Sequence, residues 1–232
     1  MAIEAVIFDL DGTLADFNLD YRSVRMEVKN FLMKKGLPSS VLSTKENIFN
    51  MLDKTSIFLR NRDESEKTIE KILEEALTLA ENREVEAAKK TSLLPGVSET
   101  LRILREKRLK IGLFTVNSQK ATEHILKRFR LASFFSVIVP RDSLRHVKPS
   151  VDHLKAVLKA LEVDPDKALV VGDSVNDMTC ARELNVIAVG FPTGFSSNKE
   201  LIDSGANYII TSITDLPGLI DQIRKSSRKM KF

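Results

Sequence analysis

Hydrophobic positions along this chain follow two different patterns, one typical of buried strands and one typical of helices. The stretch of residues 5–14 opens with a short apolar run and ends in acids and a glycine, which predicts a buried parallel strand that runs into a turn. No convincing strand follows between residues 16 and 92. Apolar residues there recur at helical spacing, in patterns that begin near Val24, Ile48 and Asp63, and this spacing predicts a small helical bundle.

From residue 93 onward the predicted strands and helices alternate. The expected strands cover residues 110–115, 136–139, 168–172, 186–189 and 208–210, and the expected helices cover residues 97–107, 121–129, 150–161, 176–184, 200–204 and 215–224. Repeated strand and helix units of this length predict a parallel sheet with helices on both faces. We therefore expect an α/β protein whose core, residues 1–15 and 93–232, is interrupted by a helical insertion, residues 16–92.

Composition narrows the class of protein. The chain has 232 residues, of which 43% are hydrophobic, and its 36 basic and 32 acidic residues nearly balance, so nucleic-acid binding is not expected. The basic tail, residues 224–232, is more typical of a solvated terminus. Cys180 has no disulfide partner, and no apolar run approaches the roughly 20 residues that cross a bilayer. We expect a cytoplasmic protein with no membrane contact.

Two acids follow the first predicted strand directly. Asp9 and Asp11 stand where that strand leaves the sheet, and two ionised carboxylates held at the edge of an apolar sheet require a counter-charge. Hard oxygen donors suit Mg²⁺, and a carboxylate beside such an ion can also attack phosphorus. The alternative interpretation of this stretch is an acidic turn that caps the next segment.

Two later strands also end in polar residues. The strand over residues 110–115 runs into Thr115, Val116, Asn117 and Ser118, which offer a hydroxyl, an amide side chain and backbone N–H groups to an anion. The strand over residues 168–172 is followed by Asp173, which could complete an ion site, with Asp177 reached through water or an amide. Ordinary helix capping is the alternative interpretation in both places.

One lysine has a position that favours a role at the same edge. Lys148 precedes Pro149, and proline restricts the local backbone, so this ammonium can be held against a cluster of carboxylates and a phosphate. A solvated surface lysine is the alternative. The three histidines, His124, His146 and His153, show no metal-ligand spacing with the cysteine, so a zinc site is not expected.

Taken together, these motifs resemble those of the haloacid dehalogenase-like (HAD) hydrolase superfamily. Its four motifs occur in order, as the run from Asp9 to Thr13, Thr115 after an apolar strand, Lys148 with Pro149, and Gly172-Asp173 with Asp177. The resemblance implies a Rossmann-like sheet with strand order 3-2-1-4-5-6. It also implies that residues 16–92 are a helical C1-type cap, as in the phosphoglycolate phosphatase-like branch.

The resemblance also implies a role for each motif residue. Asp9 resembles the nucleophile, and Asp11 the general acid and base, whose backbone carbonyl resembles a Mg²⁺ ligand. Thr115 and the Val116 N–H would hold phosphate oxygens, and Lys148 would offset the charge on Asp9 and on the phosphoryl group. Asp9 and Asp173 would hold Mg²⁺ directly, with Asp177 supporting them.

These roles predict a Mg²⁺-dependent phosphatase that acts on a small phosphorylated metabolite, such as a phosphoglycolate-like compound or a sugar phosphate. A phosphomutase with the same motifs is the alternative enzyme, and a receiver-like, phosphate-gated binding protein is the alternative of another class. An acid at position 11 favours phosphoryl transfer over dehalogenation.

Substrate choice and oligomeric state are left open by the sequence. Phe17 stands where many relatives carry serine, and Val116 stands where many have asparagine directly after the threonine. Arginines of the helical insertion, Arg22, Arg25, Arg60 and Arg62, are candidates to meet a substrate carboxylate or second phosphate, although solvated helix faces are the more usual explanation of such residues.

Overall fold

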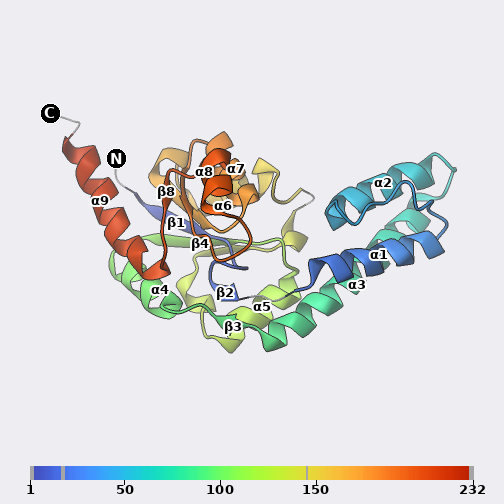
Figure 1. Cartoon of the computed structure of the whole chain (residues 1–232), viewed down its shortest axis with the longest axis horizontal. Coiled ribbons are helices and arrows are strands. Elements are labelled where there is room, and N and C mark those ends of the chain that lie inside the picture. Colours follow the sequence, from blue (N-terminus) through green and yellow to red (C-terminus); the bar gives the residue numbers. More distant parts are fainter. Residues whose placement is uncertain (1–2, 17–18, 145, 230–232) are drawn as a thin grey trace. The chain divides into compact units, whose positions relative to one another are not determined.

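Strand β1, Ala5–Phe8, lies at the centre of a parallel sheet (Figure 1). Our computed structural model describes residues 3–16, 19–144 and 146–229, and within these ranges the sheet has six strands in the order β5-β4-β1-β6-β7-β8. The bounds of the other strands are Lys110–Phe114 for β4, Val137–Val139 for β5, Ala168–Gly172 for β6, Ile187–Gly190 for β7 and Tyr208–Ile209 for β8. Counted along the chain, this is the predicted order 3-2-1-4-5-6, so the α/β fold prediction is confirmed.

Burial explains which strands are central. Every residue of β1 and β6 is buried, as their continuous apolar runs predict for strands covered on both faces. Strands β5 and β8 lie at the two edges and contain half-buried and exposed positions. The strongest apolar runs of the sequence therefore lie beside each other in the middle of the sheet.

Helices cover both faces of this sheet (Figure 1). Helix α6, Val151–Leu161, packs on β4 and β5, whereas α4, Val97–Glu106, packs on β4 and on α9, Leu216–Lys229. The remaining helices of this unit are α5, Gln119–Arg128, α7, Val175–Glu183, and α8, Asn198–Ser204. Ser150 caps α6 as predicted, because its side chain accepts a hydrogen bond from the Asp152 N–H.

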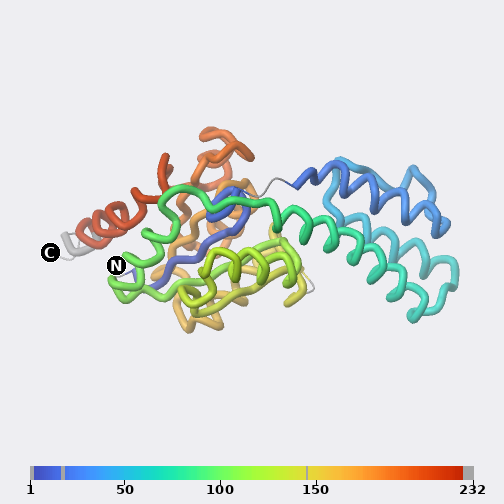
Figure 2. Tube along the Cα trace, turned by 90° about the horizontal axis from the view of Figure 1, so that it is seen from below, coloured from blue at the N-terminus to red at the C-terminus, as the bar shows by residue number. Residues whose placement is uncertain are grey.

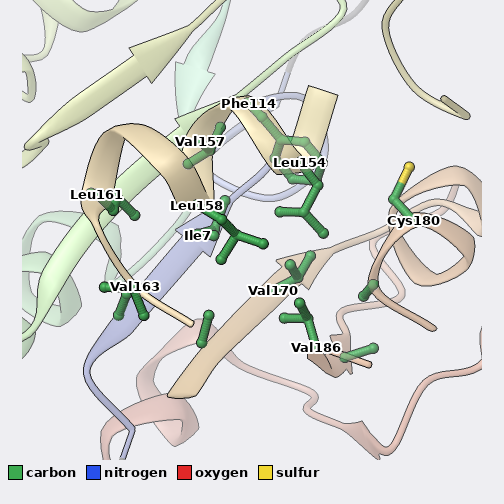
Figure 3. Packing of buried hydrophobic residues seen from close by; sticks show 14 of the residues in the cluster. Ile7, Phe114, Leu154, Val157, Leu158, Leu161, Val163, Val170, Cys180 and Val186 are labelled. Carbon is green, nitrogen blue, oxygen red and sulfur yellow. The ribbon is translucent and has the colours of Figure 1, made fainter. Parts of the chain in front are cut away.

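The core between α6 and the sheet is made of aliphatic side chains. Figure 3 shows residues of α6, among them Leu154 and Leu158, directed toward Ile7 of β1 and Val170 of β6. Burial of each such side chain contributes roughly 1.5–3 kcal/mol. Gly112 of β4 lies under the same helix, where an added Cβ would come within 2.7 Å of Val157 Cγ1.

A second unit, residues 18–89, has a hydrophobic core of its own. Helices α1, Tyr21–Lys34, α2, Ile48–Arg60, and α3, Glu66–Lys90, run alongside one another, coloured blue to green in Figure 2. Their buried residues include Val28, Met51 and Ile69, which belong to the three predicted helical patterns. The chain thus divides into residues 18–89 and a sheet-containing unit, residues 1–17 and 90–232. The assignment of residues 16–92 as a cap stays a prediction.

Two short strands differ from the expectation that no strand occurs between residues 16 and 92. Strand β2, Ala15–Asp16, pairs antiparallel with β3, Ser92–Leu93. The Thr91 hydroxyl also donates a hydrogen bond to the Asp16 carbonyl. Strands of two residues cannot display an alternating pattern, so only the pairing of distant segments reveals them.

Two sequence features lie partly or wholly outside what the structure describes. Phe17 is outside the described residues, and so are residues 230–232 of the basic tail. In the described ranges, every helix is too short or too polar to span a bilayer.

The close packing at Gly112 predicts a stability difference between two glycine substitutions. Gly112→Ala is expected to lower the free energy of unfolding by about 1–3 kcal/mol, because the added methyl group meets Val157 and Leu161. Gly218→Ala, in α9 where nothing lies within 4 Å of the new Cβ, is expected to raise it by about 0.5–1 kcal/mol. Urea unfolding of both variants measures the difference, and equal effects would contradict the packing described here.

Candidate active site

The predicted site residues gather at one edge of the sheet. Strands β4, β1 and β6 are adjacent and parallel, so the segments that follow them leave the sheet side by side. These segments begin with Thr115, Asp9 and Asp173. The edge lies where strand order reverses, which is where open α/β sheets bind their ligands.

The loop after β1 is a tight turn built around Gly12. The Asp9 N–H donates to the Val171 carbonyl of β6 at 3.0 Å, and the Leu10 carbonyl accepts from Leu14 N–H at 2.9 Å. Gly12 has a φ of 68°, and a Cβ at this position would overlap the carboxylate of Asp173. A glycine is therefore required here both by the backbone conformation and by the space that Asp173 occupies.

Three buried carboxylates lie together at this edge. Asp9, Asp173 and Asp177 each place one carboxylate oxygen within 4.8 Å of the others. Asp173 Oδ2 is buried and has no hydrogen-bond partner within the described part of the chain. Carboxylate oxygens held together in this way, with Asp173 Oδ2 unpaired, could hold a divalent cation.

Lys148 contacts two of these carboxylates. Its Nζ lies 2.7 Å from Asp9 Oδ1 and 2.7 Å from Asp177 Oδ1, and it also lies 4.2 Å from the ring centroid of Phe114. The side chain is only 3% exposed. The lysine is thus a buried cation held against carboxylates, and the alternative of a solvated surface lysine is excluded.

The crowding of negative charge changes the acidity of these groups. Burial raises the pKa of Asp9 to about 6, although Lys148 opposes the shift. Burial, followed by the charges of Asp9 and Asp177, raises the pKa of Asp173 to about 8. Burial disfavours the charged form of Lys148, but the two carboxylates outweigh it and raise its pKa. The charge of one lysine does not offset three carboxylates, so the site favours a further cation.

Both carboxylate oxygens of Asp177 make contacts that the sequence did not predict. Its Oδ2 accepts hydrogen bonds from the Ser174 N–H at 3.1 Å and the Ser174 hydroxyl at 2.6 Å, which completes a capping box at the start of α7. Its other oxygen contacts Lys148. Gly172 makes room for this side chain, since a Cβ there would lie 2.5 Å from the carboxylate of Asp177.

The segment after β4 connects to Asp11. The Asn117 N–H donates to Thr115 Oγ1 at 3.2 Å, and the Asn117 side-chain Nδ2 donates to Asp11 Oδ1 at 2.7 Å. Ser118 caps α5 by accepting from Ala121 N–H. The structure therefore brings Thr115, Asn117 and Asp11 together, while Asp11 lies outside the group of three carboxylates that could hold a cation. The roles expected for these residues stay predictions.

His153 supports Lys148 and was missed as a site residue from the sequence. Its Nδ1 accepts from the Lys148 N–H at 3.3 Å, and its Nε2 donates to the Val139 carbonyl at 2.9 Å. Burial and the charge of Lys148 lower the pKa of His153 to about 4, so the ring is neutral at physiological pH. Its position five residues after Lys148, in the first turn of the predicted helix, was the only available signal.

Two other residues hold the loops of the site by their backbones. Thr193, in the segment after β7, donates its hydroxyl to the Gly12 carbonyl. Arg141 is buried, and its guanidinium donates to the Val116 carbonyl at 3.4 Å. Neither contact follows a spacing rule, so sequence patterns could not have indicated them.

The edge thus combines a buried carboxylate beside a lysine, a possible cation site and a hydroxyl at the start of a helix. The family model described as "Haloacid dehalogenase-like hydrolase" matches residues 6–191, a range that contains all these groups. The chain belongs to the haloacid dehalogenase-like hydrolase family. The predicted family membership is confirmed, and so is the prediction that the protein is a hydrolase.

Individual relatives agree with this family. The chain is 28% identical over 222 residues to the phosphoglycolate phosphatase of Pseudomonas putida, covering 93% of this chain and 79% of the relative. It is 26% identical over 228 residues to the phosphoglycolate phosphatase of Nitrosococcus oceani, covering 94% and 97%. The structure of β-phosphoglucomutase from Clostridium difficile superimposes with a TM-score of 0.67 at 22% identity, covering 98% and 99%, and this likeness shows the fold alone.

The raised pKa of Asp173 predicts how stability depends on pH in the presence of a chelator. Because the folded-state pKa, about 8, lies above the ordinary value of 3.8, ionisation of Asp173 costs the folded protein stability as pH rises between these values. Asp173→Asn removes that cost. From pH 4 to pH 8, the unfolding free energy of the variant is expected to rise relative to that of the wild type by more than about 1 kcal/mol.

Urea titrations in EDTA at several pH values measure this gain, and a constant difference across the range would contradict it. In the same assay, adding a divalent cation at pH 8 should stabilise the wild type and leave Asp173→Asn nearly unchanged.

Proposed function

We propose that this hydrolase is a Mg²⁺-dependent phosphatase that acts on a small phosphorylated metabolite through a phosphorylated Asp9. The observation that carries the proposal is the buried carboxylate of Asp9, which lies 2.7 Å from Lys148 Nζ and beside Asp173 and Asp177. A carboxylate in this position is oriented and partly neutralised, and it can meet an electrophilic phosphorus at the sheet edge.

The residues present fit a magnesium ion. Asp9 and Asp173 would hold it directly, with the Asp11 backbone carbonyl as a further oxygen donor and Asp177 in support, and the unpaired Asp173 Oδ2 agrees with this assignment. When bound, the ion would offset the charge of the carboxylates and of the phosphoryl oxygens.

The reaction proceeds in two displacements at phosphorus. Asp9 attacks the phosphorus, the bond from phosphorus to the leaving oxygen breaks, and Asp11 donates its proton to that oxygen. Asp11 then takes a proton from a water molecule, which attacks the phosphorus and breaks the bond to Asp9. Inorganic phosphate leaves, and both carboxyl groups return to their starting state.

Three groups would stabilise the charge that develops on the phosphoryl oxygens. The Lys148 ammonium is fixed by Asp9 and Asp177, and the Thr115 hydroxyl and the Val116 N–H precede the helix α5, whose N-terminus favours an anion. Thr115 is fully buried, so its hydroxyl would act in a site with little water.

The class of substrate is supported by the relatives. Proteins named phosphoglycolate phosphatase are 26–28% identical to this chain over almost its full length, so a phosphorylated small carboxylic acid is the first substrate to test. The helical unit, residues 18–89, is proposed to act as the cap. Its arginines Arg22, Arg25, Arg60 and Arg62 are the candidates to contact an anionic group of the substrate. Arg60 also pairs with Glu66, and Arg62 stacks on Phe58.

A nucleophilic Asp9 predicts that turnover depends on one carboxylate. Asp9→Asn is expected to lower phosphatase activity on p-nitrophenyl phosphate and on phosphoglycolate, both with Mg²⁺, by at least about 10³-fold, because an amide cannot form the intermediate. Asp152→Asn is the matched control, since Asp152 is exposed on α6, and it should keep full activity. Phosphate release near the wild-type rate by Asp9→Asn would overturn the assignment.

The different roles proposed for Asp9 and Asp11 predict that phosphorylated Asp9 accumulates when Asp11 is replaced. Asp11→Asn should still be phosphorylated by p-nitrophenyl phosphate, whose leaving group departs without protonation, but it should hydrolyse the product slowly. Rapid mixing should show a burst of about one nitrophenolate per site, and mass spectrometry should find one phosphoryl group on the peptide that contains Asp9. A linear time course without a modified peptide would contradict the covalent route.

Product analysis separates the phosphatase from the phosphomutase alternative. Stoichiometric release of inorganic phosphate from the best substrate supports hydrolysis. Conversion of a sugar phosphate to its isomer without phosphate release would favour the mutase.

A further inference from the structure

The carbonyl of Val139, at the end of β5, lies between the two segments proposed to bind the phosphoryl group. It accepts hydrogen bonds from the Thr115 N–H at 3.2 Å and from Nε2 of His153 at 2.9 Å. The other ring nitrogen of His153, Nδ1, accepts from the Lys148 N–H at 3.3 Å. One imidazole ring therefore connects the backbone of Lys148, through Val139, to the backbone of Thr115.

Phe114 provides a second connection between the same residues. Its ring meets the ring of His153 edge to face, with the centroids 5.4 Å apart and the planes at 66°. Lys148 Nζ lies 4.2 Å from the centroid of Phe114, and this phenylalanine directly precedes Thr115. Phe114 and His153 are both fully buried. The imidazole thus contacts Lys148 at its backbone and also packs on the ring beside its ammonium group.

The partners of His153 determine where its proton lies. A backbone N–H only donates, so Nδ1 must present its lone pair to Lys148, and Nε2 must carry the hydrogen that is donated to the Val139 carbonyl. A single neutral tautomer satisfies both contacts. Because both nitrogens bind backbone groups, His153 acts through its neighbours and is not itself a catalytic residue.

We propose that His153 is a positioning residue, which fixes the Thr115 hydroxyl and the Lys148 ammonium relative to each other so that both meet the same phosphoryl group. This inference rests on the proposed function, because it concerns two groups that stabilise charge in that reaction. A rigid ring between the two segments restricts their relative motion before the substrate binds, and this restriction lowers the cost of reaching the reactive geometry.

Three substitutions separate positioning from packing. His153→Leu removes both hydrogen bonds, and it should lower kcat/KM for p-nitrophenyl phosphate with Mg²⁺ by at least about 30-fold, because small displacements of such groups are costly. His153→Asn places an oxygen near Nδ1, and His153→Gln places an N–H donor near Nε2, so each keeps one contact. Each of these two variants should retain at least about three times the kcat/KM of the leucine variant.

A purely structural role of the ring predicts the opposite order. Leucine fits a buried apolar position, whereas a buried amide that keeps only one partner is costly there. Urea unfolding should therefore find His153→Leu at least as stable as the two amide variants, although it is the least active. A leucine variant whose kcat/KM equals or exceeds those of the amide variants would overturn the proposal.

Inhibition by orthovanadate supplies a readout that loss of folded protein does not change. Vanadate takes up the five-coordinate geometry of the transferring phosphoryl group, so its binding requires both oxygen-binding groups in place. The Ki of vanadate should rise at least about tenfold in His153→Leu. An unchanged Ki and KM with a lower kcat would indicate only a smaller folded fraction and would overturn the proposal.

A second histidine provides the matched control for these measurements. His124→Leu changes a half-buried residue of α5 and should keep the wild-type KM and the wild-type Ki. If His153→Leu does not fold, the Ki of His153→Gln, which lacks the contact with Lys148, replaces it and should rise at least about threefold.

Nitrogen NMR tests the bridge without turnover. The chain has three histidines, so the ring signals of His153 are identified by their loss in His153→Gln. At pH 7 the ring should be neutral with its hydrogen on Nε2. A hydrogen on Nδ1, in the neutral or the charged ring, would overturn the proposal, because Nδ1 could then not accept from Lys148.

The two proposals fail in different ways. Wild-type KM and Ki in His153→Leu, in an enzyme that Asp9→Asn inactivates, would overturn the role of His153 and leave the phosphatase assignment intact. A wild-type protein that hydrolyses neither p-nitrophenyl phosphate nor phosphoglycolate, or an active Asp9→Asn variant, would overturn both.

Discussion

The contact of the Lys148 ammonium with two buried carboxylates organises the site. Nζ lies 2.7 Å from both Asp9 Oδ1 and Asp177 Oδ1. Both carboxylates are buried, so water does not stabilise their charges. Breaking a buried pair by removing one partner typically costs about 3–5 kcal/mol, because the remaining charge is left without compensation. Since Asp177 also caps α7, this one lysine ties the end of β1 to the start of that helix.

The same cluster holds more negative charge than Lys148 offsets. Burial raises the pKa values of Asp9 and Asp173, so their ionised forms are less favourable in the folded protein than in water. Stability must come from elsewhere, and the aliphatic core between α6 and the sheet supplies it. The proposed site for a cation and a phosphate thus lies on a sheet that has an aliphatic core of its own.

The groups that hold the site in place differ in kind from those that would act in it. His153, Thr193 and Arg141 bind backbone groups of the Lys148, Gly12 and Val116 segments. Asn117 binds the side chain of Asp11. These contacts reduce the freedom of the loops in advance, and such preorganisation lowers the cost of reaching the reactive geometry.

The sequence by itself determined the strands of the six-stranded sheet, the main helices and the kinds of chemical group at the strand ends. Continuous apolar runs such as those of β1 and β6 indicate burial on both faces, and the acids that follow them must lie at the sheet edge, so Asp9 and Asp173 could be predicted as neighbours once the family's strand order was assumed. Only the tertiary structure decided which side chains pair. The antiparallel contact of Ala15–Asp16 with Ser92–Leu93, the hydrogen bond from Asn117 to Asp11 and the support of Lys148 by His153 join residues brought together by folding. The periodicity of hydrophobic residues predicts which residues are buried. It does not predict which distant residue each one contacts, because that contact depends on how whole helices and strands are placed in space.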